Sequence, residues 1–138
     1  MAPPFVTKAN QPPRSKEHTM QYAMLICGDE DAWTDLTPAG EEEVMKEIYA
    51  WYEKWQPSGK IADGGVELQP KHTAKTIRRG TDGAPVVTDG PYVELKEVIG
   101  SIVMLECDSI DEAVRIASEW PSSGGMNTIE VRPVMVRE

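Results

Sequence analysis

Two segments of the chain carry apolar residues at both sets of alternating positions. In residues 20–27, apolar side chains fill both faces, and residues 98–107 repeat this over the longest apolar stretch of the sequence. The alternation places Ile99, Val103 and Leu105 opposite Val98, Ile102 and Met104. Such a pattern is typical of strands that are covered on both sides. We therefore expect both segments inside a sheet, with residues 98–107 at its centre.

Two other segments have the spacing of helices. The first starts at Thr37, which is followed by proline, and ends before Pro57, with apolar residues three or four positions apart between them. The second lies between Ser109 and Pro121, and Ser109 with Glu112 forms a capping box at its start. The sequence thus predicts two amphipathic helices, of which the first has a strongly acidic polar face.

Shorter patterns complete the order of elements. Strands are predicted over residues 61–66, 73–79, 84–88 and 127–136, and residues 28–36 form a polar loop. The strands over 73–79 and 84–88 flank an Asp82-Gly83 turn, which indicates an inserted β-hairpin. Pro133 suits either a strand at the edge of a sheet or a bulge. Without the hairpin, the order is strand, helix, strand, strand, helix, strand, which predicts an α+β, ferredoxin-like sandwich.

This sandwich has helices on one face of its sheet only, yet two strands are apolar on both faces. A second copy of the chain, packed sheet to sheet, would cover the open face, so a homodimer is expected. The first and the central strand run antiparallel as neighbours in this fold. Cys27 and Cys107 end these strands and should therefore lie at opposite edges, too far apart for a disulfide.

The composition limits the domain organisation and the partners. A chain of 138 residues suits one domain, and residues 1–19, with four of the eleven prolines, read as an N-terminal arm before a domain over residues 20–138. The net charge of -9 disfavours nucleic acid and membrane surfaces as partners. No zinc-ligand spacing, membrane span or secretory signal is present in the sequence. We expect a soluble, cytoplasmic protein with neither a metal site nor a cofactor.

The densest polar segment is residues 88–97, with the sequence Thr-Asp-Gly-Pro-Tyr-Val-Glu-Leu-Lys-Glu. It resembles the signature of the DGPF family within the YCII-related superfamily, where Asp-Gly-Pro-Phe precedes Glu-x-Lys-Glu; Tyr92 stands where phenylalanine is usual. Gly28-Asp29, Gly64-Gly65 and the closing segment over residues 129–133 agree with the resemblance. The resemblance implies a dimeric α/β barrel. It implies little about activity, since fold alone does not give function.

Two readings exist for the charged residues near this motif. Asp89 can organise a turn through its carboxylate, or it can bind a ligand or transfer a proton. A charged cluster of Glu94, Lys96 and Glu97, with Arg132 as a further member, forms either a structural ion-pair cluster or the polar end of a pocket. In the second reading Lys96 or Arg132 holds a carboxylate or enolate, and Glu94 moves the proton.

Further candidates are one histidine and three aromatic residues. In the resemblance, members of the superfamily similar to muconolactone isomerases use a histidine and aspartate pair. Here His72, in a loop, is either the base of such a pair or a solvated side chain. Tyr22 can line an apolar pocket or belong to the core. Trp33 is the aromatic residue without a core assignment and is a candidate for the lip of a pocket, and Tyr92 is a candidate ligand contact.

Two classes of function follow from these observations. The first is a DGPF-type protein that binds a small organic ligand between sheet and helices, including the case of a cofactor-free isomerase or lyase. The second is a non-catalytic dimeric interaction module. The span from Asp29 to Glu53 holds nine acidic residues and Lys46 alone as a base, and it could dock a basic protein. Members of the family that the chain resembles are often labelled as associated with transcription initiation. Through this resemblance alone, the label suits the second class of function.

Overall fold

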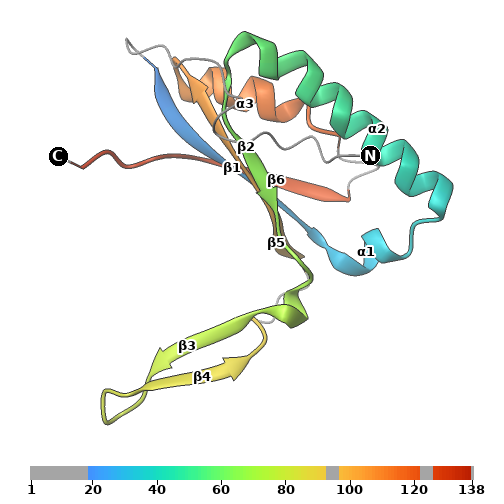
Figure 1. Cartoon of the computed structure of the whole chain (residues 1–138). Coiled ribbons are helices and arrows are strands. Elements are labelled where there is room, and N and C mark those ends of the chain that lie inside the picture. Colours follow the sequence, from blue (N-terminus) through green and yellow to red (C-terminus); the bar gives the residue numbers. More distant parts are fainter. Residues whose placement is uncertain (1–18, 93–96, 122–125, 138) are drawn as a thin grey trace.

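The computed structural model describes residues 19–92, 97–121 and 126–137 of the chain (Figure 1). The predicted N-terminal arm over residues 1–19 therefore lies outside the described residues, apart from Thr19. In chain order the elements are β1 (Met20–Asp29), α1 (Glu30–Thr34), α2 (Pro38–Trp55), the 3-10 turn η2 (Gln56–Ser58), β2 (Ile61–Glu67), the 3-10 turn η3 (Lys71–Thr73), β3 (Lys75–Arg79), β4 (Pro85–Asp89), β5 (Glu97–Cys107), α3 (Ile110–Ser118) and β6 (Asn127–Pro133).

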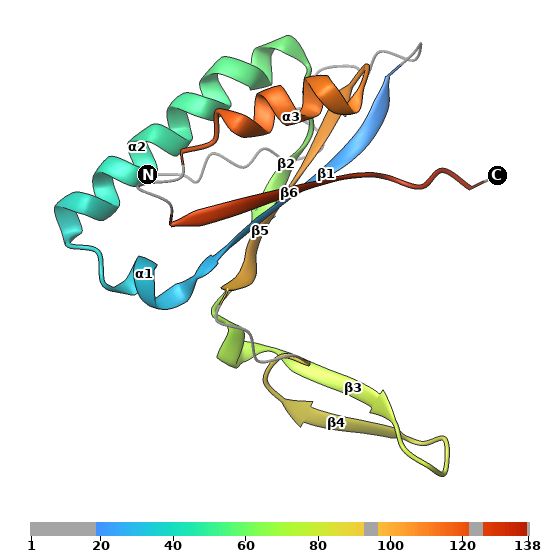
Figure 2. The same cartoon turned by 180° about the vertical axis from the view of Figure 1, so that it is seen from behind.

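The main sheet has four strands in the order β2-β5-β1-β6, and each neighbouring pair is antiparallel. Helices α2 and α3 lie together on one face of this sheet (Figures 1 and 2). This arrangement confirms the predicted α+β class, the order of elements and the central position of β5. It also confirms the edge position of β6, although that strand ends at Pro133 and not at residue 136.

The core lies between the helices and the covered face of the sheet. Met24 of β1, Val103 and Leu105 of β5, and Ile116 of α3 are fully buried. Trp51 of α2 lies among them, 4% exposed, and its Nε1 donates a hydrogen bond to the carbonyl oxygen of Ile116 at 3.0 Å. The apolar stripe of each helix, predicted from its spacing, thus faces the sheet.

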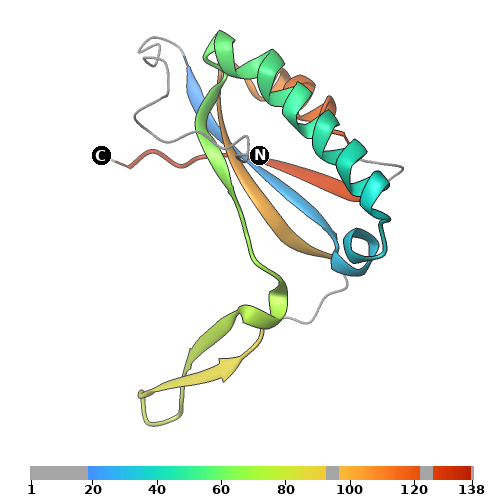
Figure 3. The same ribbon diagram turned by 45° about the vertical axis from the view of Figure 1, so that its right-hand side comes forward.

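The opposite face of the sheet is apolar as well. The register pairs Ala23 with Met104 and Leu25 with Ile102, and these four side chains are half-buried. Ile99 on the same face is 43% exposed. We refer to these five residues as the open face. Within the described part of the chain, only the face under α2 and α3 is covered by helices (Figure 3).

A bulge in β5 changes which residues share a face, and here the predicted alternation was wrong. The register passes from Ile26 opposite Ser101 directly to Cys27 opposite Ile99, so Gly100 is the additional residue. Because one extra residue reverses the alternation, Ile99 points to the open face and Val98 to the helix-covered face. On the other side of β5, the Gly100 carbonyl oxygen accepts a hydrogen bond from the Leu68 amide at 2.7 Å, just after the end of β2.

The segment predicted as a polar loop over residues 28–36 contains the short helix α1. Asp29 caps this helix, because its Oδ1 accepts a hydrogen bond from the Asp31 amide at 2.9 Å. Glu30 and Asp31 lie in the first turn, where negative charge interacts favourably with the helix dipole. Polarity alone predicted a loop, but the same carboxylates stabilise a helix start when they occupy these positions.

The predicted hairpin forms a separate two-stranded sheet of β3 and β4. Its turn follows the prediction: Gly83 has φ +83°, and Asp82 Oδ1 accepts the Ala84 amide at 3.0 Å. β3 starts two residues later than predicted, because η3 occupies Lys71–Thr73, and it ends at Arg79 as predicted. β4 starts and ends one residue later than predicted. The hairpin extends away from the sandwich in Figures 1 to 3.

Both cysteines are free, as predicted. Cys107 lies opposite Met20, at the other end of β1 from Cys27, so about seven residues and roughly 24 Å of strand separate them. Burial raises the pKa of the Cys107 thiol to about 12, and burial also raises the pKa of Cys27. The two thiols therefore stay protonated near neutral pH.

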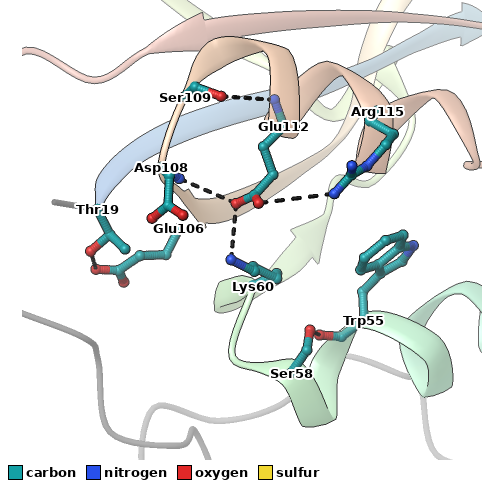
Figure 4. A network of polar contacts seen from close by, with 9 residues as sticks. All are labelled: Thr19, Trp55, Ser58, Lys60, Glu106, Asp108, Ser109, Glu112 and Arg115. Atoms are coloured by element: carbon teal, nitrogen blue, oxygen red, sulfur yellow. Dashed lines mark hydrogen bonds and ion pairs between the residues drawn. The ribbon is translucent and has the colours of Figure 1, made fainter.

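An ionic network fixes the N-terminal end of α3 against the start of β2 (Figure 4). Lys60 Nζ donates to Glu112 Oε1 at 2.9 Å, and the Asp108 amide donates to the same oxygen at 3.2 Å. Ser109 Oγ accepts the Glu112 amide at 3.1 Å, so the predicted capping box is present in part. The hydrogen bond from Lys60 lowers the pKa of Glu112 below its ordinary value of 4.5.

Replacing Glu112 with glutamine should lower the free energy of unfolding by about 1–2 kcal/mol at pH 7, because it removes a partly buried charged pair. A pKa that is lower in the folded than in the unfolded chain adds stability above 4.5. This contribution is lost as the pH falls through the folded pKa, so the difference between variant and wild type should shrink in acid. Urea unfolding between pH 3 and 7 measures it.

The control for this measurement is Glu119→Gln. Glu119 pairs with Lys54 at the surface, where both side chains are 40% or more exposed, so we expect a loss below about 1 kcal/mol. Equal losses in the two variants, or a Glu112→Gln effect that does not depend on pH, would contradict the proposed role of the Lys60–Glu112 pair.

Candidate functional site

A cavity of about 530 Å³ lies between the sheet and the helices, at the end of the sheet where β1 leads into α1. It is bounded by α1, α2, the ends of β1 and β2, the start of β5 and β6, and the segment around η3. The residues that line it are Ile26, Gly28, Asp29, Glu30, Asp31, Trp33, Thr34, Met45, Ile48, Glu67, Leu68, Pro70, His72, Val98, Gly100, Ser101, Trp120, Met126 and Asn127.

Apolar side chains from the covered face of the sheet and from α2 form much of this lining. Ile26 is buried, and Val98 reaches the cavity because the bulge at Gly100 turns it toward the helices. Met45 and Ile48 contribute from α2, and Ile48 also packs against the core. The cavity is therefore continuous with the hydrophobic interior, and an apolar group placed in it would leave water.

Carboxylates supply most of the charge of the lining. Asp29, Glu30 and Asp31 come from the start of α1, and Glu67 comes from the last position of β2. Among the described lining residues no lysine or arginine is present, and His72 is the one residue that can carry a positive charge. This imbalance gives the cavity a negative potential.

One hydrogen bond joins the two segments that carry the polar lining. Glu30 Oε2 accepts the backbone amide of Lys71 at 2.8 Å, across 41 positions of sequence. Since Lys71 precedes His72 in η3, this contact holds the histidine segment beside α1. His72 is exposed and Trp33 half-buried, so both can meet a molecule that enters from solvent.

Glycine is required at position 28 by the close approach of β1 and the start of β6. A Cβ atom there would lie 2.9 Å from both Asn127 Oδ1 and the Met126 carbonyl oxygen. Both of these residues line the cavity. A side chain at Gly28 would therefore displace that wall.

Of the residues predicted from the sequence, the structure places His72 and Trp33 in the lining of the cavity. It places Asp89 and Tyr92 outside that lining, at the end of the hairpin that returns to the main sheet. Asp89 is 84% exposed at its side chain and forms an ion pair with Lys75. Gly90, which follows it, has φ +92°, in agreement with the turn reading of this segment.

Three of the remaining candidates, Tyr92, Tyr22 and Arg132, also lie apart from the cavity. Tyr92 is 68% exposed, and the guanidinium of Arg78 lies 5.3 Å from its ring centre. Tyr22 is 3% exposed and belongs to the core. Arg132 is exposed and lies opposite Ala23 in the register, on the open face of the sheet. Glu94 and Lys96 lie outside the described residues.

Sequence reasoning missed the four acidic residues of the lining as site candidates. Asp29, Glu30 and Asp31 were counted within a generally acidic span, and Glu67 belonged to no motif. Asp29 directly before two further carboxylates is a helix-start pattern, which could have indicated that these groups are held together at the end of β1.

Comparison with known proteins concerns the part of the chain that forms the sheet, the helices and the cavity. Residues 20–137 match the model of the YCII-related domain. The chain belongs to the YCII-related domain family. The resemblance seen in the Asp-Gly-Pro segment is confirmed at this level.

A curated relative of this YCII-related protein extends the comparison. An uncharacterised protein of Rhizobium meliloti (strain 1021) is 33% identical over 119 residues, which cover 83% of this chain and 92% of the relative. The two proteins therefore correspond over nearly their whole length.

Two further findings concern the described residues of this YCII-related domain. None of its helices in the described ranges combines the length and the apolar character that crossing a bilayer requires. Within the same ranges, no three histidine, cysteine or acidic side chains are grouped in a way that could hold a metal ion.

Proposed function

We propose that this protein binds a small organic ligand in the cavity between its sheet and its helices. The observation that carries the proposal is the cavity itself, whose volume of about 530 Å³ lies within the range of about 300–1,000 Å³ typical of small-molecule sites. Apolar walls with few polar groups are characteristic of such sites. The position of Trp33 and His72 in the lining supports the same reading.

The charge of the lining favours a particular ligand chemistry. A molecule with an apolar body and an ammonium or another hydrogen-bond donor would place its apolar part against Ile48 and Val98 and its polar end near Glu67 and Asp31. A carboxylate of equal size would meet like charge and lose its hydration without compensation. We therefore expect amines to bind more tightly than matched acids.

A thermal-shift comparison tests this expectation. With 2-phenylethylamine at ten times its dissociation constant, the folded state should gain about 1.4 kcal/mol and melt several degrees higher. 3-Phenylpropanoate and a neutral aromatic lactone at the same concentrations should give smaller shifts. Glu67→Gln should reduce the amine shift specifically, because it removes one carboxylate without changing the shape of the lining.

The control variant is Val98→Phe, which fills the cavity from the covered face of the sheet. It should fold and abolish the shift for every compound that binds in the cavity. Equal shifts of the melting temperature in wild type and Val98→Phe would contradict ligand binding in the cavity. Wild-type protein whose melting temperature does not change with any of the three compounds would contradict it as well.

We also propose that the protein is a homodimer of the DGPF group, with two sheets packed face to face as in a dimeric α/β barrel. The support is the apolar open face, defined above, together with the Asp89-Gly90-Pro91-Tyr92 segment. Contiguous apolar surface of this kind is stabilised when it is removed from water, and a second copy offers an identical surface.

Sedimentation at micromolar concentration should give about twice the chain mass of 15.3 kDa. Leu25→Glu should raise the dimer dissociation constant at least about a hundredfold, because an unpaired carboxylate would be buried between the sheets. Val114→Glu is the matched control, since Val114 is 48% exposed on α3, on the helix side of the sandwich. Wild-type protein that sediments as a single chain would refute the dimer.

Catalysis is a second candidate function, which the place of His72 in the cavity favours. A bound molecule with an acidic carbon-bound proton could transfer that proton to the imidazole without a cofactor, as in an isomerase or lyase. Loss of turnover with retained binding in His72→Gln would support this role. The non-catalytic alternative is docking of a basic protein on the acidic residues of α2. In that case Val98→Phe should leave the affinity for the basic protein unchanged.

A further inference from the structure

The β3–β4 hairpin is the part of the described chain that is least packed against the rest. All three views show it extending away from the sandwich, well separated from α2 and α3 (Figures 1 to 3). Its two strands pair with each other over five residue pairs, from Lys75 opposite Asp89 to Arg79 opposite Pro85. An isolated two-stranded ribbon is only marginally stable in water, and it needs a further strand or a packed face.

The hairpin carries apolar side chains that face solvent in the single chain. Ile77 and Val87 lie directly opposite each other, so their side chains share one face of the ribbon. They are 68% and 59% exposed, and Val86 on the other face is 49% exposed. β-branched residues favour strands because they pack against a covering surface, and here the described chain supplies no such cover.

The charge of the hairpin is opposite to that of the whole molecule. From the start of η3 to the end of β4 the sequence holds four basic residues, Lys71, Lys75, Arg78 and Arg79, but only two acidic ones, Asp82 and Asp89. The entire chain has a net charge of -9. Exposed carboxylates are dense at the start of α2, where Glu41, Glu42 and Glu43 follow one another. The hairpin is therefore attracted to the remainder of a molecule like itself.

We propose that the β3–β4 hairpin packs against a second copy of this chain and buries the Ile77–Val87 pair at that contact. The basic side chains of the hairpin then face carboxylates of the partner. In a twofold dimer each hairpin makes this contact once, so the interaction occurs twice. The proposal rests on the homodimer proposed above. It adds the hairpin contact to the contact between the two open faces.

A second copy fits the hairpin better than other acidic partners. Nucleic acid and anionic lipid would be attracted by the four basic residues but repelled by the molecule as a whole, and neither provides an apolar surface for Ile77 and Val87. Another copy of the chain supplies both exposed carboxylates and exposed apolar side chains.

The test compares two double variants with the same starting residues. Ile77→Asp with Val87→Asp places charge on the hairpin, and Ile110→Asp with Val114→Asp places it on α3, where the two residues are 40% and 48% exposed. Sedimentation equilibrium should show a dimer dissociation constant at least tenfold higher for the hairpin variant, and within about twofold of wild type for the α3 variant. Melting curves confirm that each variant is folded.

Hydrogen exchange of the wild-type chain provides a measurement that needs no variant. Peptides covering β3 and β4 should exchange slowly above the dimer dissociation constant and rapidly below it, whereas peptides from α3 should change little. Unchanged exchange with dilution, or equal dissociation constants for the two variants, would overturn the hairpin contact while leaving the sheet-to-sheet dimer intact. A wild-type chain that never dimerises would overturn both.

Discussion

Replacing Trp51 with alanine is expected to lower the free energy of unfolding by about 3–5 kcal/mol, as large aromatic truncations in a core do. The side chain is 4% exposed and connects the two long helices, because its Nε1 donates to the Ile116 carbonyl oxygen. Its ring also packs edge-on against Tyr52 and Trp120, with ring centres 5.0 and 5.1 Å away. Alanine would leave a cavity, remove the hydrogen bond from Nε1 to the Ile116 carbonyl oxygen and remove one ring from the aromatic cluster with Tyr52 and Trp120.

The control for Trp51 lies one turn further along the same helix. Trp55 is only half-buried at the edge of the core, so Trp55→Ala should cost clearly less. Trp51→Phe should fall between the two, because it keeps an aromatic ring but loses the hydrogen bond, which is worth about 1 kcal/mol. Urea unfolding monitored by circular dichroism measures all three. Equal losses for Trp51→Ala and Trp55→Ala would contradict the central position of Trp51.

Gly65→Ala is expected to destabilise the protein by about 2–3 kcal/mol, for two reasons that add. The backbone at Gly65 has φ +85°, which residues with a Cβ atom rarely adopt. A Cβ atom there would also lie 2.8 Å from the Ile102 carbonyl oxygen, which is backbone of the central strand and cannot move away. The change would therefore push β2 off β5.

Gly59→Ala separates the two causes. Gly59 has a similar φ of +77°, but nothing lies within 4 Å of a Cβ atom placed there. We expect a loss of about 1 kcal/mol from backbone strain alone. If Gly59→Ala lowers the free energy of unfolding as much as Gly65→Ala does, the close approach of β2 to β5 contributes nothing to the loss at Gly65.

The parts of the fold that the sequence predicts well are those encoded by neighbouring residues. Thr37 caps α2 through Oγ1, Ser109 caps α3, and each helix ends near the predicted proline. The antiparallel pairing of β1 with β5 followed from the predicted order of elements, in which these two strands are neighbours. Gly100 shows the limit of such reasoning, because a bulge depends on how two strands meet and not on the residues of either strand alone.

The site was less predictable than the fold because its residues come from segments far apart in sequence. The sequence indicated His72 and Trp33 only as two unrelated candidates, and the structure places both in the lining of the cavity. The carboxylates beside them became recognisable only from the positions of α1 and the end of β2. The Asp-Gly-Pro segment drew attention to Asp89 and Tyr92, which lie at the hairpin. A motif identified the family here without locating the cavity.

The two edges of the main sheet have a consequence for how copies of this protein can meet. β2 pairs with β5 at only four positions, with register shifts between Ile61 and Asp63 and between Asp63 and Val66. β6 ends in Pro133, which has no amide hydrogen to donate. The irregular pairing of β2 and the proline at the end of β6 therefore limit the row of hydrogen-bonding groups that each edge offers to an incoming strand. Growth of the sheet by strand addition, the usual route from an exposed edge to fibrous aggregates, is disfavoured at both ends.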